Sequence, residues 1–128
     1  MFKDTQAFSS FSVDDPEAAK KFYGETLGMD ISDVPDMGGL LQMSISGGGK
    51  VMIYSKPDHA PATFTVLNFP VDDIDAAVDE LADRGVDFEI YDEGGLKTDS
   101  KGVMRANGPQ IAWFRDPAGN VLSVLESG

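Results

Sequence analysis

The chain has 128 residues, of which 41% are hydrophobic and 25% charged, and this balance is typical of one globular domain. Its formal net charge of -12 disfavours a nucleic-acid partner or an anionic membrane surface, because a strongly negative protein is repelled by both. The absence of cysteine excludes disulfides and sulfur-ligated zinc. The N-terminus lacks a signal-peptide core and no apolar run approaches the roughly 18 residues that span a bilayer, so we expect a cytoplasmic protein.

The first predicted elements are a strand over residues 7–13 and a helix over residues 17–27. Asp15 is placed to accept the free backbone N–H groups of the first helical turn, and Pro16 suits the first helical position. Gly28 favours a left-handed end to the helix. These residues predict a strand that leads directly into a capped helix.

The second half repeats this pattern. A strand over residues 64–71 leads into a helix over residues 74–84, and the tripeptide Val-Asp-Asp stands at the same place in both halves. Three further strands follow each helix, at residues 29–34, 40–45, 51–55, 86–91, 111–114 and 121–125. We therefore expect an α+β fold in a single domain over residues 1–128, with one βαβββ module at about 5–57 and another at about 63–127.

Residues 92–109 do not fit a compact repeat. This glycine-rich segment carries Lys97, Lys101 and Arg105 in a chain that is otherwise poor in basic residues. Two interpretations remain open, a solvated excursion and a lid over a pocket. Arg105 is either solvated or a clamp for an anionic ligand.

Two motifs indicate a family. Residues 22–29 read FYGETLGM and residues 114–120 read FRDPAGN, in order and in register with the repeat. With them, the chain resembles the vicinal oxygen chelate superfamily, which includes glyoxalase I, extradiol dioxygenases and bleomycin-resistance proteins. The resemblance covers nearly the whole chain. It implies two modules whose curled mixed sheets enclose an open cup for a ligand, and a homodimer.

In metal-using members of that superfamily, four side chains that point into the cup hold a divalent ion, usually His or Gln on the first strand of each module and Glu on the last. The repeat register matches those positions to Phe8, Val66, Ser123 and Ile53, with Tyr54 as the alternative to Ile53. Hydrocarbon side chains have no lone pairs to offer, and a neutral serine hydroxyl is a poor ligand by itself. We therefore expect no metal and no cofactor.

Period-two alternation places Ser10, Ser12 and Asn68 toward the cup. These side chains either contact a ligand or hydrogen-bond within the domain. Trp113 either packs in the core or stacks on a bound ring, and His59 is either a surface histidine or a base at the rim. The candidate ligand-binding residues are Ser10, Ser12, Tyr54, Asn68, Trp113, Ser123, His59 and Arg105.

A mostly apolar lining with a few hydroxyls and one amide suits a small organic ligand. We predict a glyoxalase- or bleomycin-resistance-like protein that binds such a molecule in a metal-free cup. The alternative is a lyase, isomerase or dioxygenase-type enzyme with an unrecognised metal, or with an acid–base site at His59, Tyr54 or Arg105. A third interpretation is a module without a ligand that pairs with itself or with another protein. Ligand identity, the occurrence of catalysis, and module pairing within or between chains stay open.

Overall fold

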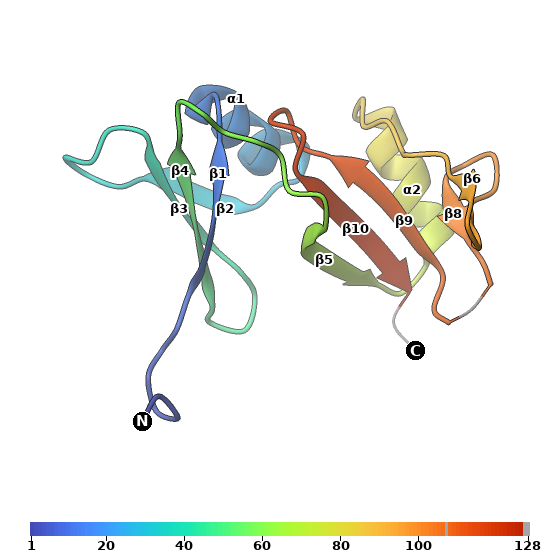
Figure 1. Ribbon diagram of the computed structural model, residues 1–128, viewed down its shortest axis with the longest axis horizontal. Helices are drawn as coiled ribbons and strands as arrows, with labels where there is room; N and C mark the ends of the chain where they lie inside the picture. The colour runs from blue at the N-terminus through green and yellow to red at the C-terminus, as the bar shows by residue number, and fades with distance from the viewer. Residues whose placement is uncertain (107, 127–128) are drawn as a thin grey trace. The chain divides into compact units, whose positions relative to one another are not determined.

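The computed structural model describes residues 1–106 and 108–126. Residue 107 of the glycine-rich segment and residue 127, the expected end of the second module, lie outside the described residues. The chain divides into two compact units, Met1–Ala60 and Pro61–Gly128. Each unit builds its own four-stranded mixed sheet with helix packed on one face (Figure 1).

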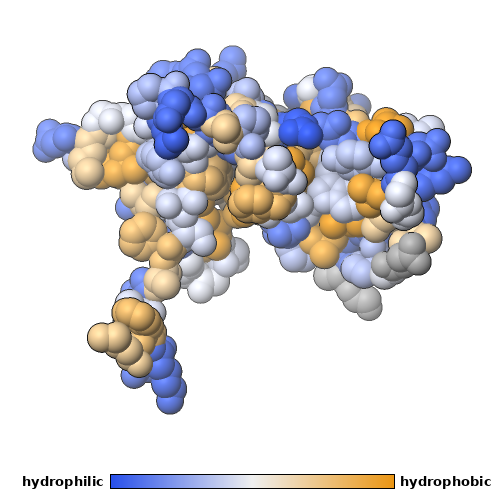
Figure 2. All heavy atoms as spheres, in the orientation of Figure 1, coloured by the Kyte–Doolittle hydropathy of each residue, from blue (hydrophilic) through white to orange (hydrophobic). Residues whose placement is uncertain are grey.

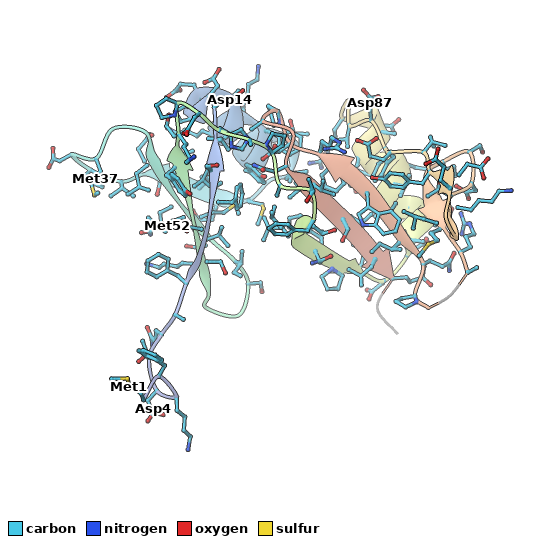
Figure 3. All side chains as sticks on the ribbon, in the orientation of Figure 1. Met1, Asp4, Asp14, Met37, Met52 and Asp87 are labelled. Atoms are coloured by element: carbon cyan, nitrogen blue, oxygen red, sulfur yellow. The ribbon has the colours of Figure 1, made fainter. Side chains whose placement is uncertain are left out.

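Unit 1 contains β1 (Ser9–Val13), α1 (Pro16–Lys21), a π-helical turn η1 (Phe22–Thr26), β2 (Asp30–Asp33), β3 (Leu40–Ser44) and β4 (Lys50–Ser55). The strands lie in the order β1-β4-β3-β2, with β1 parallel to β4 and the other pairs antiparallel. An N-terminal arm that carries Met1 and Asp4 extends from the start of β1 (Figure 3).

The predicted cap of the first helix is confirmed. The Asp15 carboxylate accepts hydrogen bonds from the backbone N–H groups of Glu17 and Ala18, and Pro16 opens the helix. The second half of the segment is a π-turn instead of the expected α-helix, since the Leu27 N–H bonds to the Phe22 carbonyl at 2.9 Å. The segment also places the Tyr23 ring fully inside the core of the unit.

The core of unit 1 lies between the helical segment and one face of the sheet. Alternate strand residues are buried there, namely Val13, Leu41, Met43, Val51 and Ile53. Because successive side chains of a strand point to opposite faces, Ser10, Ser12, Met52 and Tyr54 lie on the other face. We call this face, which no helix of the unit covers, the open face of the sheet.

Unit 2 contains β5 (Thr65–Val71), α2 (Ile74–Asp83), β6 (Asp92–Glu93), β7 (Leu96–Lys97), β8 (Val103–Met104), β9 (Ile111–Arg115) and β10 (Val121–Glu126). The order β5-β10-β9-β8, with β5 parallel to β10, repeats the topology of unit 1. The α+β class with two open, four-stranded mixed sheets is therefore confirmed. No helix of the described residues has the length and apolar character needed to cross a membrane.

The predicted strand over residues 86–91 is wrong. That stretch makes one bridge, from Phe88 to Phe114, and the outer strand of the sheet is β8. After Phe88 the chain leaves the sheet and forms the β6–β7 hairpin. It then returns at Gly102, which lies beside Phe88. Gly102 permits this return, because its φ is +91° and an added Cβ would lie 2.8 Å from the Phe88 Cβ. We call residues 92–106 the insert.

The turn between β9 and β10 is built by its own side chains. The buried Asp116 carboxylate accepts hydrogen bonds from the backbone N–H groups of Ala118 and Asn120 and from the Asn120 side-chain amide. Asn120 in turn accepts one from the Ala62 N–H at 3.2 Å. The second motif therefore forms a rigid hairpin that also anchors the start of unit 2.

Candidate functional site

Three of the predicted residues form a row on the second sheet. They lie on the face opposite to the buried residues Ala112, Phe114, Leu122 and Val124, and we call it the open face of this sheet. Ser123 on β10 pairs with Asn68 on β5 and with Trp113 on β9. The Ser123 hydroxyl donates a hydrogen bond to Asn68 Oδ1 at 2.6 Å. Ser123 is 0% exposed, whereas Asn68 is exposed and Trp113 is half-buried. The row therefore combines a large apolar ring with a polar pair, the composition that orients small molecules in binding sites.

A β-bulge in β5 limits how far the row extends. Thr65 pairs with Val121 and Leu67 with Leu122, so Val66 between them has no partner in the register. Side chains before and after a bulge do not keep one alternation. The sequence-based assumption of strict alternation from Val66 to Asn68 is therefore wrong.

Tyr91 extends the row and was not predicted. Its ring meets that of Trp113 edge to face, with centroids 5.7 Å apart and an interplanar angle of 75°. Its backbone N–H donates to Thr98 Oγ1 at 2.9 Å, and the Thr98 N–H donates to its carbonyl at 3.0 Å. Tyr91 also lines a surface hollow of about 500 Å³ with Ile90 and Leu96. No local pattern in the sequence marks Tyr91, because its position depends on the fold of the insert.

A second group of predicted residues meets in unit 1. Ser12 lies beside Tyr54 in the β1–β4 register, and its hydroxyl is 2.6 Å from Nδ1 of His59. His59 reaches it because the connector turns back, with the His59 N–H bonded to the Lys56 carbonyl. Ser10 lies on the same open face and is exposed. These contacts place a hydroxyl, an imidazole and a phenol on one surface.

The predicted counterpart of Ser123 in unit 1, Ile53 or Tyr54, is wrong. Ser10 pairs with Met52, and Asn68, at the matching place of the repeat, pairs with Ser123, so Met52 occupies that position. Ile53 is 0% exposed and belongs to the core, whereas Tyr54 is 39% exposed on the open face. Only Tyr54 is therefore available to a ligand on that face.

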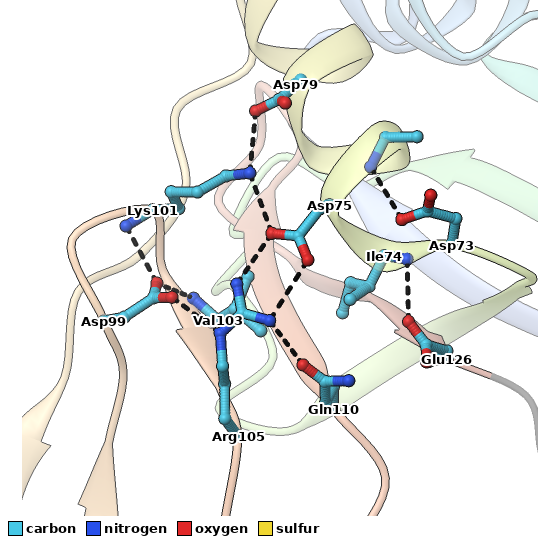
Figure 4. Close-up of polar contacts among 11 residues, drawn as sticks. Asp73, Ile74, Asp75, Asp79, Asp99, Lys101, Val103, Arg105, Gln110 and Glu126 are labelled. Carbon is cyan, nitrogen blue, oxygen red and sulfur yellow. Dashed lines mark hydrogen bonds and ion pairs between the residues drawn. The ribbon is translucent and has the colours of Figure 1, made fainter.

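Arg105 lies beside α2 within unit 2. Its guanidinium donates to both oxygens of Asp75, to Asp99 at 2.9 Å and to the Gln110 side chain (Figure 4). Lys101 also binds Asp75, at 2.9 Å. Hydrogen bonds from Arg105 and Lys101 hold the pKa of Asp75 well below its usual range. The chemistry available to Arg105 here is that of an ion pair within unit 2.

The four positions that hold a metal in other members of the resembled superfamily do not suit one here. Phe8 precedes β1 and is 65% exposed, Val66 lies at the bulge, and the position predicted for Ile53 is occupied by the thioether side chain of Met52. Ser123 is a neutral hydroxyl already bonded to an amide oxygen. Within residues 1–106 and 108–126, no three His, Cys, Asp or Glu side chains gather in a way that could hold an ion. The residues at these positions therefore do not fit a divalent cation.

Comparison with known proteins identifies the family. The profile of the Glyoxalase/Bleomycin resistance protein/Dioxygenase superfamily matches residues 7–124. No curated protein sequence matches the chain significantly.

Solved structures are similar over nearly the whole chain. TnmS3, an antibiotic binding protein from Streptomyces sp. CB03234, shares 29% identity with a TM-score of 0.71, over 98% of each chain. A glyoxalase/bleomycin resistance protein from the same strain shares 30% identity with a TM-score of 0.63, over 93% of this chain and 99% of the other. A superfamily member from Sphaerobacter thermophilus DSM 20745, at 24% identity and a TM-score of 0.69 over 94% and 97%, supports the fold alone. The chain therefore belongs to the glyoxalase/bleomycin resistance protein/dioxygenase superfamily.

Proposed function

We propose that the protein binds a small organic molecule without a metal, on the open face of the second sheet. The ligand packs against Trp113 and is oriented by Asn68, whose side chain the fully buried Ser123 hydroxyl holds in place. Apolar area supplies the affinity and the polar pair fixes the orientation. A homodimer, as the superfamily resemblance implies, and a cytoplasmic location are part of the same proposal.

The observation that supports this function best is the hydrogen bond between Ser123 and Asn68. Ser123 occupies the position at which metal-using members carry a glutamate. Its hydrogen bond to Asn68 forms a neutral polar pair beside the half-buried indole of Trp113. Such a surface favours neutral or weakly polar rings over anions, since the chain carries a formal net charge of -12. The antibiotic-binding function of TnmS3, which is 29% identical, also supports a small organic ligand.

Trp113 is the only tryptophan, so its fluorescence reports on the site directly. We expect quenching or a spectral shift when a panel of aromatic and antibiotic compounds is titrated into the protein. Ser123→Ala should weaken a binder roughly tenfold, about the effect of one lost hydrogen bond. Ser46→Ala, in the exposed hairpin of unit 1, is the matched control and should leave affinity unchanged. A panel without a response, by fluorescence and by calorimetry, would contradict the proposal.

Elemental analysis of the purified protein tests the metal-free state separately. We expect substoichiometric zinc, nickel, iron and manganese. One tightly bound ion per chain would contradict it.

Acid–base catalysis is a second candidate function, favoured by the 2.6 Å contact between Ser12 Oγ and His59 Nδ1. A histidine this close can accept a hydroxyl proton, and Tyr54 supplies a phenol next to it. Turnover that is lost in His59→Gln and kept in Ser123→Ala would support an enzyme. Binding without turnover of any ligand found above would support the binding protein.

The homodimer would cover the edge of a sheet. β1 and β5 each lie at the edge of their sheet, and edge strands are commonly covered by pairing. Light scattering should therefore give twice the chain mass of 13.7 kDa. A monomer at micromolar concentration would contradict this part.

A further inference from the structure

Thr98 of the insert holds Tyr91, which contacts Trp113 in the site. Thr98 is 8% exposed and makes three hydrogen bonds with Tyr91, which close the segment between them into a loop. The Tyr91 ring then rests against Trp113. The position of the indole therefore depends on a contact made within the insert.

The insert also covers the outer edge of β9, the strand of Trp113. Val103 and Met104 of β8 pair with Ala112 and Ile111, directly before Trp113. Before the insert begins, the Glu89 N–H donates to the Trp113 carbonyl at 2.8 Å. Glu89, which precedes the insert, and β8, near its end, thus both hold the backbone of β9 beside the indole.

Asp75, in the first turn of α2, ties the insert to the body of unit 2. Its carboxylate accepts Lys101 at 2.9 Å and Arg105 at 2.7 Å. Asp99 organises the turn that presents both cations, because it accepts the Lys101 and Val103 N–H groups and the Arg105 side chain. Figure 4 shows Asp75 between Lys101 and Arg105. Mostly hydrophilic residues surround the insert at the surface (Figure 2), so salt can reach the pairs.

We propose that the insert sets the position of Trp113 in the ligand site, with Thr98 and Asp75 as positioning residues. Thr98 fixes Tyr91 against the indole, and Asp75 fixes β8 against β9 through Lys101 and Arg105. Ionic strength regulates the second connection and not the first. The effect on ligand binding rests on the function proposed above, whereas the effect on Trp113 itself does not.

The first experiment uses the whole chain without ligand. Thr98→Val and Asp75→Asn should raise acrylamide quenching of Trp113 about twofold and speed amide exchange at residues 103–113 roughly fivefold. Thr98→Ser keeps the hydroxyl and should restore wild-type values. Asp33→Asn removes the exposed Lys20–Asp33 pair of unit 1 and is the matched control, which should change neither measurement.

Salt separates the two positioning residues. Raising the salt from about 0.01 M to about 1 M shortens the Debye length from about 30 Å to about 3 Å. This change should increase Trp113 quenching in the wild type and in Thr98→Val, and have little further effect in Asp75→Asn. Unchanged quenching and exchange in both variants, or equal changes in Asp33→Asn, would overturn the proposal.

Ligand binding distinguishes this proposal from the proposed function. Compounds found with the wild type should bind Thr98→Val and Asp75→Asn several-fold more weakly, chiefly through faster dissociation. If the Trp113 signal changes as expected but no compound binds any variant, the function fails and the positioning role stands. If compounds bind all variants equally and the signal is unchanged, the positioning role fails and the function stands.

Discussion

The two sheets share their strand order, yet each holds a serine of its open face in a different way. In unit 2, Ser123 bonds to Asn68 on the neighbouring strand, so the polar pair belongs to the sheet. In unit 1, Ser12 bonds to His59, which comes from the chain segment after the last strand. The first pair is fixed by a strand register and the second by a connector. The repeated topology therefore provides the same surface twice with different chemistry on each copy.

The outer strands differ as well. In unit 1 the outer strand β2 pairs with β3 over four residues. In unit 2 the corresponding edge is divided between one bridge at Phe88 and the two-residue strand β8. An interrupted edge needs other contacts to hold it, and the ion pairs of Asp75 supply them.

The strongest test of the comparison is Ser123→Glu, which restores the residue type of the metal-using members. Because Ser123 is fully buried, we expect an unpaired carboxylate there to destabilise the protein by about 4 kcal/mol in denaturant unfolding. Zinc, nickel or manganese should not restore the lost stability, since the other three positions offer no ligand. Full stability, or uptake of one ion, would contradict this account of the site.

The hairpin turns of the two units should respond unequally. Asp116→Ala removes three hydrogen bonds to a buried carboxylate, so we expect a loss of about 3 kcal/mol in the free energy of unfolding. Ser46→Ala, in the exposed turn between β3 and β4, should change it by less than about 0.5 kcal/mol. Equal effects would show that the second turn is not held by its own side chains.

Two glycines of unit 2 separate steric contact from backbone conformation. Gly102→Ala adds a Cβ at 2.8 Å from Phe88 and 3.0 Å from the Glu89 carbonyl, and should cost about 2 kcal/mol. Gly94 also has a positive φ but no atom within 4 Å, so Gly94→Ala should cost only about 1 kcal/mol. Thermal unfolding measures both. A smaller loss for Gly102→Ala would contradict the close return of the insert.

Acid should release the insert only well below neutral pH. Hydrogen bonds from Arg105 and Lys101 lower the pKa of Asp75 in the folded state, so the stabilisation is complete above its unfolded pKa of about 3.9. It is lost as the pH falls through the lower, folded pKa. Amide exchange in the insert, corrected for intrinsic rates, should therefore be constant from about pH 7 to about pH 5 and rise only below about pH 4. A rise between pH 7 and pH 5 would assign control to another group.

Much of the fold follows from local signals. Asp15 with Pro16 and Gly28 are cap signals within a few residues, and the first helix begins where they predict. The second helix begins at Ile74, as the repeat predicts. Because the second half repeats the first, each half was then predicted to form a sheet of the same kind. The divided outer strand of unit 2 was not predicted, because residues 86–91 look like a strand locally and are interrupted only by the later return of the chain at Gly102.

The candidate site was predictable only in part. Asn68, Ser123 and Trp113 were each named from the sequence, but the strand register that brings them together was not, since the bulge at Val66 interrupts the alternation assumed from the repeat. The contacts of His59 with Ser12 and of Tyr91 with Trp113 were not predicted. Both depend on how an irregular segment folds back, and no periodicity in the sequence encodes that.

The bond from the Ala62 N–H to Asn120 has a consequence for dissecting the chain. Pro61 also lies against the turn, since a Cβ added to Gly119 would lie 3.1 Å from the Cβ of Pro61. A truncated fragment that begins at Pro61 therefore keeps its anchor on the last hairpin, whereas one that begins at Phe64 loses it and leaves the Asn120 amide oxygen without that donor.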